Sequence, residues 1–309
     1  MVMEDRILKG SVRRALDEIG DRWTLLILLS AFCDVERFDD WKVRFGISPS
    51  ILSSRLKKLV TIGILTKQPV GKGARRLRYM LTDKGADLFL WALSVWDWES
   101  VWIYRDSDHP VQLQHTGCGH RTRPRFACTH CGKRVSYDNV IIERGPGYDD
   151  VMVSETPDSR RSSTTTEDND NEIFLGRSVD TIGDRWSFLV ISAAYFGVTR
   201  FDNFQSQLDI ASNILSDRLR HLANHGMLAR NRYQERPARY EYILTEKTIA
   251  YYNVPLMLAL WGDKWLPTRS GLPFLRYHET CGHALGITPY CQHCDEELVR
   301  GEVRFITPD

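Results

Sequence analysis

The chain has 309 residues, of which 42% are hydrophobic and 26% are charged, and its formal net charge is +1. A chain of this length can form two domains of about 100 to 150 residues with ordinary buried cores. No apolar run approaches the roughly 20 residues that cross a bilayer, and the N-terminal segment lacks an apolar signal core, which excludes a membrane-spanning or exported protein and predicts a cytoplasmic one.

The dominant feature of the sequence is an internal repeat with a constant offset of 163 residues. The stretch IGDRW at 19–23 returns at 182–186, and ISPSILSSRLKKLVTIGIL at 47–65 returns as IASNILSDRLRHLANHGML at 210–228. Nothing is inserted or lost over about 120 residues, loops included. A whole folded unit has therefore been duplicated.

In chain order, the first unit starts with two helices that meet at the GDRW turn, where Asp21 is expected to cap the second helix. The apolar run from Trp23 to Leu29 predicts that this second helix is the buried centre of the domain. A third helix is expected at 37–45, and a fourth follows Ser48, a good N-cap that precedes a proline. Helix, tight turn and helix form the helix-turn-helix pattern.

The fourth helix combines a buried stripe with a polar, basic face. Leu52, Leu56 and Leu59 fall at i, i+4 and i+7, which places them on one side of the helix. A charged face alone is typical of any solvated helix. From Trp41 to Thr82, however, the chain has ten Lys and Arg residues and no Asp or Glu, and this single sign of charge favours contact with a phosphate backbone.

A hairpin with a Gly-rich basic tip follows in the sequence LTKQPVGKGARRLRYMLT at 65–82. Its two β-like arms predict a wing that can reach phosphates or the minor groove, although an ordinary solvated hairpin has the same pattern. The matching window of the second unit, 204–245, has six Arg but four acidic residues, and Asp217 replaces Ser54. We therefore expect the first unit to supply most of the non-specific DNA affinity. The second unit reads bases, serves as a dimerisation partner or has lost DNA binding.

Residues 86–104 predict a helix that is apolar on more than one face and carries four tryptophans. One domain core cannot cover such a helix, so it is expected to form an interface, either between the two halves or between two chains. A cofactor box of aromatic rings is the alternative. In the second copy of this helix, Pro255 predicts a kink or a break.

Each unit ends in a Cys/His module with the spacing HxxC, nine residues, CxxC. Two donors before a hairpin and two after it can enclose one tetrahedral zinc ion, so two structural zinc ions per chain are expected. His120 and His283 also recur, but HxxC has the better chelating spacing. Reduced buried cysteines or a CxxC redox pair are the alternatives, and the absence of HExxH and HxE motifs argues against a catalytic zinc. The predicted ligands are His115, Cys118, Cys128 and Cys131 in the first module and His278, Cys281, Cys291 and Cys294 in the second.

The polar segment at 144–171, rich in Ser, Thr and Asp, predicts a flexible linker. About 25 flexible residues have a root-mean-square span of roughly 25 to 30 Å, which is near one helical turn of DNA. The two units are therefore expected to read adjacent half-sites as tethered domains.

Four motifs together resemble the HxlR family of bacterial winged-helix transcription regulators: IGDRW, the ISxxxLSxRLxxLxxxGxL pattern, the wing ending in RPARYEYILT, and LALWGDKW. The resemblance implies operator DNA binding through a recognition helix and a wing, by dimers joined through terminal helices. Cysteine sensing, known in some members, is not expected, because Gly10, Ser11 and Val12 occupy the relevant positions. Two such domains in one chain predict either a homodimer or an intrachain pseudo-dimer.

The resemblance also assigns site residues, and for Arg55 and Arg218 it leaves an internal salt bridge and a DNA contact as equal alternatives. The expected DNA contacts are Ser50, Ser53, Ser54, Lys57, Lys72, Arg75, Arg76 and Arg78 in the first unit and Asn213, Ser216, Arg220, Arg236 and Arg239 in the second.

The sequence thus predicts a mainly α protein with small β-wings, of the α+β class. Its expected parts are winged helix-turn-helix domains at 5–105 and 172–268, Cys/His modules at 112–138 and 275–300, and the linker at 144–171. The expected function is a transcription regulator that binds double-stranded DNA, with a small-molecule effector left open. The alternative is a protein-interaction scaffold without salt-dependent affinity for duplex DNA. No nucleophile-and-base set favours an enzyme.

Overall fold

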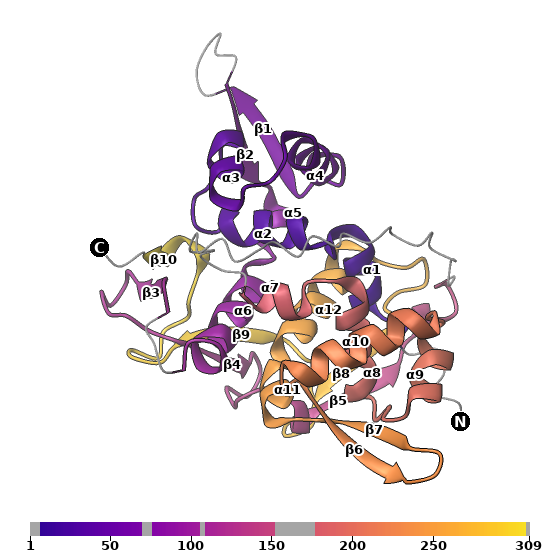
Figure 1. The fold of residues 1–309 in the computed structure, drawn as a ribbon. Coiled ribbons are helices and arrows are strands. Elements are labelled where there is room, and N and C mark those ends of the chain that lie inside the picture. Colours follow the sequence, from indigo (N-terminus) through magenta and orange to yellow (C-terminus); the bar gives the residue numbers. More distant parts are fainter. Residues whose placement is uncertain (1–6, 70–75, 106–108, 152–176, 307–309) are drawn as a thin grey trace.

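The computed structural model describes residues 7–69, 76–105, 109–151 and 177–306 (Figure 1). The first winged helix contains α1 Ser11–Ile19, α2 Arg22–Ala31, α3 Phe38–Phe45, α4 Pro49–Thr61, β1 Leu65–Pro69, β2 Leu77–Leu81, α5 Asp83–Ala86 and α6 Phe89–Trp102. The second contains α7 Arg177–Ile182, α8 Arg185–Tyr195, α9 Phe201–Leu208, α10 Ser212–Asn224, β6 Leu228–Gln234, β7 Arg239–Leu244, α11 Glu246–Tyr251 and α12 Asn253–Trp265.

The Cys/His modules consist of short strands and single 3-10 turns. The first module has β3 Gln112–His115, β4 Pro124–Cys128, η1 Tyr137–Asn139, β5 Val140–Arg144 and η2 Pro146–Tyr148. The second has β8 Phe274–His278, β9 Ile287–Cys291, η3 Arg300–Glu302 and β10 Val303–Ile306.

Local sequence signals set the helix boundaries. The side chain of Asp21 accepts a hydrogen bond from the N–H of Thr24 at the start of α2, and Ser48 accepts one from Ile51 at the start of α4. Gly63, just past α4, has a φ of 73°, where a side chain would be strained. The predicted helix-turn-helix order, its caps and the wing are confirmed.

Each winged helix has its own buried centre. The residues of α2 from Trp23 to Ala31 are all buried, as expected from their apolar run. Leu52, Leu56 and Leu59 of α4 are at most 1% exposed, and burial of each such side chain contributes about 1.5 to 3 kcal/mol. None of the helices in the described segments has the length and apolarity to cross a membrane.

The two tryptophan-rich helices α6 and α12 pack against each other in the middle of Figure 1, so the predicted interface lies between the two halves. The indole N–H of Trp98 donates to the carbonyl of Lys247, and that of Trp261 donates to the carbonyl of Lys84, both at 2.9 Å. The two contacts are equivalent, because Trp261 lies 163 residues after Trp98 and Lys247 lies 163 residues after Lys84. The halves are thus related by an internal two-fold axis, which makes the chain an intrachain pseudo-dimer.

The predicted break near Pro255 is present, one turn before the proline, because α11 ends at Tyr251 and α12 begins at Asn253. Pro255 lies in the first turn of α12, where the backbone N–H groups have no helical acceptor and the missing donor costs little. The first copy is interrupted within two residues of the corresponding place, between α5 and α6, without a proline, so the proline is not required for the break.

The Cys/His modules are interlocked, and the prediction of separate modules is wrong. Strands β4 and β9 pair antiparallel with Phe126 opposite its own counterpart Pro289. Strand β3 pairs with β10, and β8 pairs with β5, in registers that the repeat offset exchanges. All three sheets therefore join the two halves, whose relative placement is set by pairing and packing rather than by a tether.

The predicted linker starts too early. Its first residue, Arg144, ends strand β5, and Gly147 is buried so closely against the carbonyl of Gly271 that a Cβ atom there would lie 2.1 Å from that oxygen. The part of the predicted linker from 152 onward lies outside the described residues.

Candidate nucleic-acid interface and metal clusters

The predicted DNA-contacting side chains of α4 all lie on its exposed face. Ser50, Ser53, Ser54 and Lys57 are exposed, opposite the buried leucine stripe. On the first wing, Arg76 and Arg78 are exposed, whereas Lys72 and Arg75 lie outside the described residues. In Figure 1 this wing extends at the top of the molecule, away from the interlocked modules.

Two arginines on the recognition helices serve the fold. Arg55 Nε lies 2.7 Å from Asp21 Oδ1, and Arg218 Nε lies 3.0 Å from Asp184 Oδ1. The same two carboxylates cap α2 and α8. Of the two roles left open for these arginines, the structure shows the internal salt bridge, which fixes each recognition helix against the central helix of its domain.

The second unit presents a less cationic surface. Asn213, Ser216, Arg220, Arg236 and Arg239 are exposed as predicted. However, Asp217, at the position of Ser54, forms an ion pair with Arg220 one turn away. Arg220 occupies the position of Lys57, so this ion pair partly neutralises the positive charge that the first unit presents there.

The eight predicted ligands form two clusters, but in exchanged pairs. Within each cluster the donor atoms lie within 4.8 Å of one another. The prediction that each module closes its own set is wrong, because each cluster takes its HxxC pair from one half and its CxxC pair from the other. Cluster A consists of His115, Cys118, Cys291 and Cys294, and cluster B of Cys128, Cys131, His278 and Cys281.

The nine-residue spacer explains the exchange. The prediction needed a hairpin in this spacer, to return the CxxC pair to the HxxC pair of the same module. Instead Pro124–Cys128 runs straight as strand β4, and five strand residues carry the chain roughly 16 Å away. Pairing of β4 with β9 then brings Cys128 opposite Ile287, close to the HxxC turn of the other half.

The distances within the clusters fit a tetrahedral metal better than a disulfide. Cys118 Sγ lies 3.9 Å from Cys291 Sγ, and Cys128 Sγ lies 3.9 Å from Cys281 Sγ. Around a zinc ion with Zn–S bonds of about 2.3 Å, two sulfur atoms lie about 3.8 Å apart, whereas a disulfide needs about 2.05 Å. The Nδ1 atom of His278 lies 3.2 Å from Cys131 Sγ.

The backbone around the cysteines also suits anionic sulfur. Each of the four ligand pairs is followed at once by a residue with positive φ, Gly119, Gly132, Gly282 or Asp295, so the chain turns around the donors. Although burial opposes ionisation, hydrogen bonds from the Thr122 hydroxyl and from backbone N–H groups lower the pKa of Cys291 to about 6. Against a backbone hydrogen bond from Glu296, burial and the contacts with Cys291 and Cys118 raise the pKa of Cys294 to about 11, so Cys291 ionises first. A thiolate is the form that binds a metal.

The other histidines that recur at the same positions of the two repeats lie outside both clusters. His120 stacks on His293 with ring centroids 3.6 Å apart, and His130 stacks on His283 at 3.2 Å. The clusters thus contain His115 and His278, which were preferred as ligands from the sequence, and neither His120 nor His283. The remaining cysteine, Cys33, is apart from the clusters, and burial raises the pKa of its thiol far above the ordinary value.

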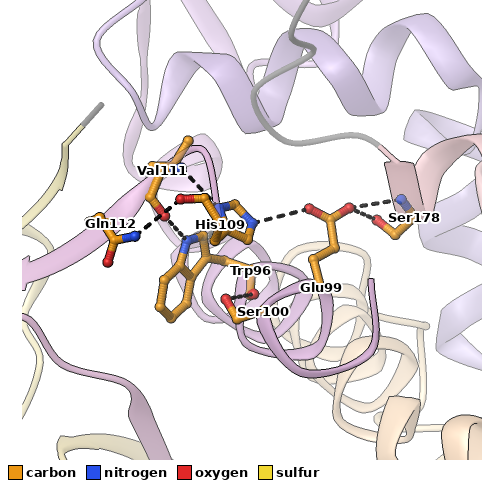
Figure 2. A network of polar contacts seen from close by, with 7 residues as sticks. All are labelled: Trp96, Glu99, Ser100, His109, Val111, Gln112 and Ser178. Atoms are coloured by element: carbon orange, nitrogen blue, oxygen red, sulfur yellow. Dashed lines mark hydrogen bonds and ion pairs between the residues drawn. The ribbon is translucent and has the colours of Figure 1, made fainter. Parts of the chain in front are cut away.

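Sequence reasoning missed a buried polar network that joins the halves (Figure 2). Glu99, fully buried on α6, accepts hydrogen bonds from the N–H of Ser178 at 2.8 Å and from its hydroxyl. Its other oxygen lies 3.7 Å from His109 Nε2, and His109 Nδ1 accepts the N–H of Val111 at 3.0 Å. The only signal in the sequence was a lone glutamate in a tryptophan-rich helix.

We expect Glu99→Gln to lower the free energy of unfolding by about 1 to 3 kcal/mol. Because His109 Nδ1 accepts a hydrogen bond, Nε2 carries the proton, and both neighbours of the carboxylate are donors. The side-chain amide of the introduced glutamine must turn its NH₂ group toward one of these two donors, which leaves that donor without an acceptor. Urea unfolding would measure the loss, and the exposed Glu279→Gln is the matched control. Equal stability of the two variants would contradict the prediction.

Comparisons with known proteins agree with the repeated fold. The HxlR-like helix-turn-helix family matches residues 18–107 and 181–270. The HTH-type transcriptional regulator Rv3095 of Mycobacterium tuberculosis is 40% identical over 144 residues, which are 47% of this chain and 91% of the relative. The regulator YvaP of Bacillus subtilis is 30% identical over 91 residues, 29% of this chain and 84% of its own.

Among solved structures, PA1607 covers 40% of this chain and 87% of its own at 28% identity, with a TM-score of 0.37, which supports no conclusion by itself. The family match alone covers more than half of the chain. Its members are regulators rather than enzymes. The chain belongs to the HxlR-like helix-turn-helix family of transcription regulators and carries two fused copies of its domain.

Proposed function

We propose that the protein binds double-stranded DNA mainly through α4 and the β1–β2 wing of its first unit. The observation that carries this proposal is the exposed face of Ser50, Ser53, Ser54 and Lys57 on a capped helix, within a 42-residue stretch that contains ten basic and no acidic residues. Such a face can make the phosphate contacts that release counterions, while its serines reach base edges.

The interlocked modules give this DNA binding a fixed geometry. Because strand pairing and the α6–α12 contact hold the two units, α4 and α10 keep one relative placement. We therefore propose that the operator has two half-sites of one preferred spacing, in contrast to the tolerance of a flexible tether. The protein would act in the cytoplasm, where its DNA lies.

We propose that clusters A and B each hold one structural zinc ion. Three thiolates and one imidazole suit zinc, and four protein donors leave no open position for catalysis. When bound, the metal supplies cross-links between the halves. His115 and His278 are both fully buried, and each leaves Nε2 without a hydrogen-bond partner among the described residues, which is consistent with Nδ1 as the ligand atom.

The test combines DNA binding with metal analysis of one sample. We expect affinity for random duplex DNA that falls steeply with salt, tighter binding to the promoter region of its own gene, and about two zinc ions per chain. Weak binding without salt dependence would overturn the DNA proposal and favour a protein-interaction scaffold. A chain that folds fully without metal would overturn the zinc proposal alone.

We expect Asp217→Ser to raise the affinity of the protein for duplex DNA about three- to tenfold at low salt. The substitution removes a negative charge from the face of α10 and releases Arg220 from its ion pair. Electrophoretic mobility shifts at two salt concentrations would measure the change. Asp202→Ser, which removes an exposed acid from α9, is the matched control. A similar gain in both variants would point to net charge alone.

A further inference from the structure

A cavity of about 310 Å³ lies where the two halves meet. Its walls come from both halves: Val12 on α1 and Val140 on β5 belong to the first, and Leu189, Leu256 and Phe274 to the second. Its volume is at the lower end of the range for small-molecule sites, about 300 to 1,000 Å³, and its lining is mainly apolar and aromatic.

The duplication shows how this space arose. Ala259 lines the cavity, and its counterpart in the first unit is Trp96. The Trp96 side chain is buried, and its indole donates to the carbonyl of Val111, the counterpart of the cavity residue Phe274. The indole therefore fills, in the first half, the space that is open in the second. A tryptophan-to-alanine difference leaves room for a ring of about that size.

A polar group of the cavity also has an apolar counterpart in the other half. Tyr252, whose counterpart is Phe89, is only 8% exposed, and its hydroxyl makes no hydrogen bond to any of the described residues. Burial raises the pKa of Tyr252 to about 12, so the hydroxyl remains a donor. The hydroxyl faces the cavity rather than a protein acceptor, so a ligand oxygen can accept its hydrogen bond in place of water.

The remaining polar side chains argue for an uncharged ligand. Among the described residues that line this cavity, Arg276 is the only cationic one, and its guanidinium is paired with Asp263. The hydroxyls of Tyr137 and Tyr195 donate to the carbonyls of Tyr195 and Thr248. Among the hydroxyls of the described residues in the lining, that of Tyr252 is the one left for a ligand.

We infer that this cavity binds a small, uncharged, mainly apolar ring compound whose oxygen accepts a hydrogen bond from Tyr252. The same ligand modulates DNA binding, a consequence that rests on the proposed function. Leu189 belongs to α8, which packs directly on the recognition helix α10. Because ligand and DNA affinities are reciprocally linked, a ligand that prefers one placement of α8 shifts DNA affinity by the same factor.

Indole-3-carbaldehyde is a suitable probe, since it combines the missing ring with a carbonyl acceptor, and 3-methylindole is the probe without the acceptor. Titration calorimetry with the full-length protein should show one site per chain, with a dissociation constant below about 1 mM for the aldehyde. Ala259→Trp should abolish binding of both probes while keeping or raising the melting temperature. Tyr252→Phe should weaken aldehyde binding about five- to tenfold and leave 3-methylindole binding unchanged.

Tyr233→Phe, which removes an exposed hydroxyl on the second wing, is the matched control and should bind both probes normally. No saturable binding of either probe, or unchanged binding by Ala259→Trp, would overturn the inference. These titrations contain no DNA, so their outcome is independent of the proposed function. A probe that binds but leaves DNA affinity unchanged would remove only the regulatory consequence.

Discussion

Replacing Cys118 and Cys291 together with serine should leave one zinc ion per chain, whereas replacing Cys118 and Cys128 together should leave none. The first pair belongs to cluster A alone, so cluster B stays complete. The second pair takes one ligand from each cluster, although both residues lie in the same module. Loss of one thiolate from a closed four-ligand site removes most of its zinc affinity.

The two double variants separate exchanged ligation from ligation within each module, because the alternative predicts the opposite stoichiometries. Zinc content of the purified, folded proteins would be measured by elemental analysis, with circular dichroism as the check on folding. Cys33→Ser is the control: its sulfur lies outside both clusters, and two zinc ions should remain. One zinc in the Cys118/Cys128 variant and none in the Cys118/Cys291 variant would refute the exchange.

If cross-unit ligation holds, metal removal should affect the whole molecule and not one small module. Each cluster has donors on both sides of the internal axis, and the three sheets that surround the clusters also cross between the halves. The strands and the α6–α12 contact support a single arrangement, to which the proposed metals would add. This cooperation would be the physical basis for the proposed half-site spacing.

Much of the winged-helix fold could be predicted from local signals. Asp21 and Ser48 cap helices because their side chains can accept backbone N–H groups, and Leu52, Leu56 and Leu59 are buried because their spacing places them on one stripe. These are short-range relations that the sequence contains directly. The constant offset of the repeat likewise predicted two equivalent units.

The exchange of HxxC and CxxC pairs between the two clusters could not be predicted from the sequence, because its cause is long-range. HxxC, nine residues and CxxC are compatible with a hairpin and with a straight strand, and only the pairing of Phe126 with Pro289 selects the strand. The same limit applies to the buried contact of Glu99 with Ser178 and to the cavity beside Ala259. Each of these features depends on which surface of one half packs against the other half. No local pattern in a duplicated sequence specifies that packing.

The unequal charge of the two units leads to the second large effect. Replacing Lys57 and Arg76 with glutamine should weaken binding to random duplex DNA roughly tenfold or more near physiological salt, and lower the salt slope by about 2, since each phosphate contact contributes about 0.9.

The repeat supplies the matched control, because Arg220 and Arg239 occupy the same positions in the second unit. Replacing those two with glutamine should have a clearly smaller effect, since Arg220 is already paired with Asp217. Affinity measured by fluorescence anisotropy across a salt series decides between them: equal losses would mean that both units bind the phosphate backbone alike, and that the ten-to-none excess of basic residues in the first unit does not direct DNA binding.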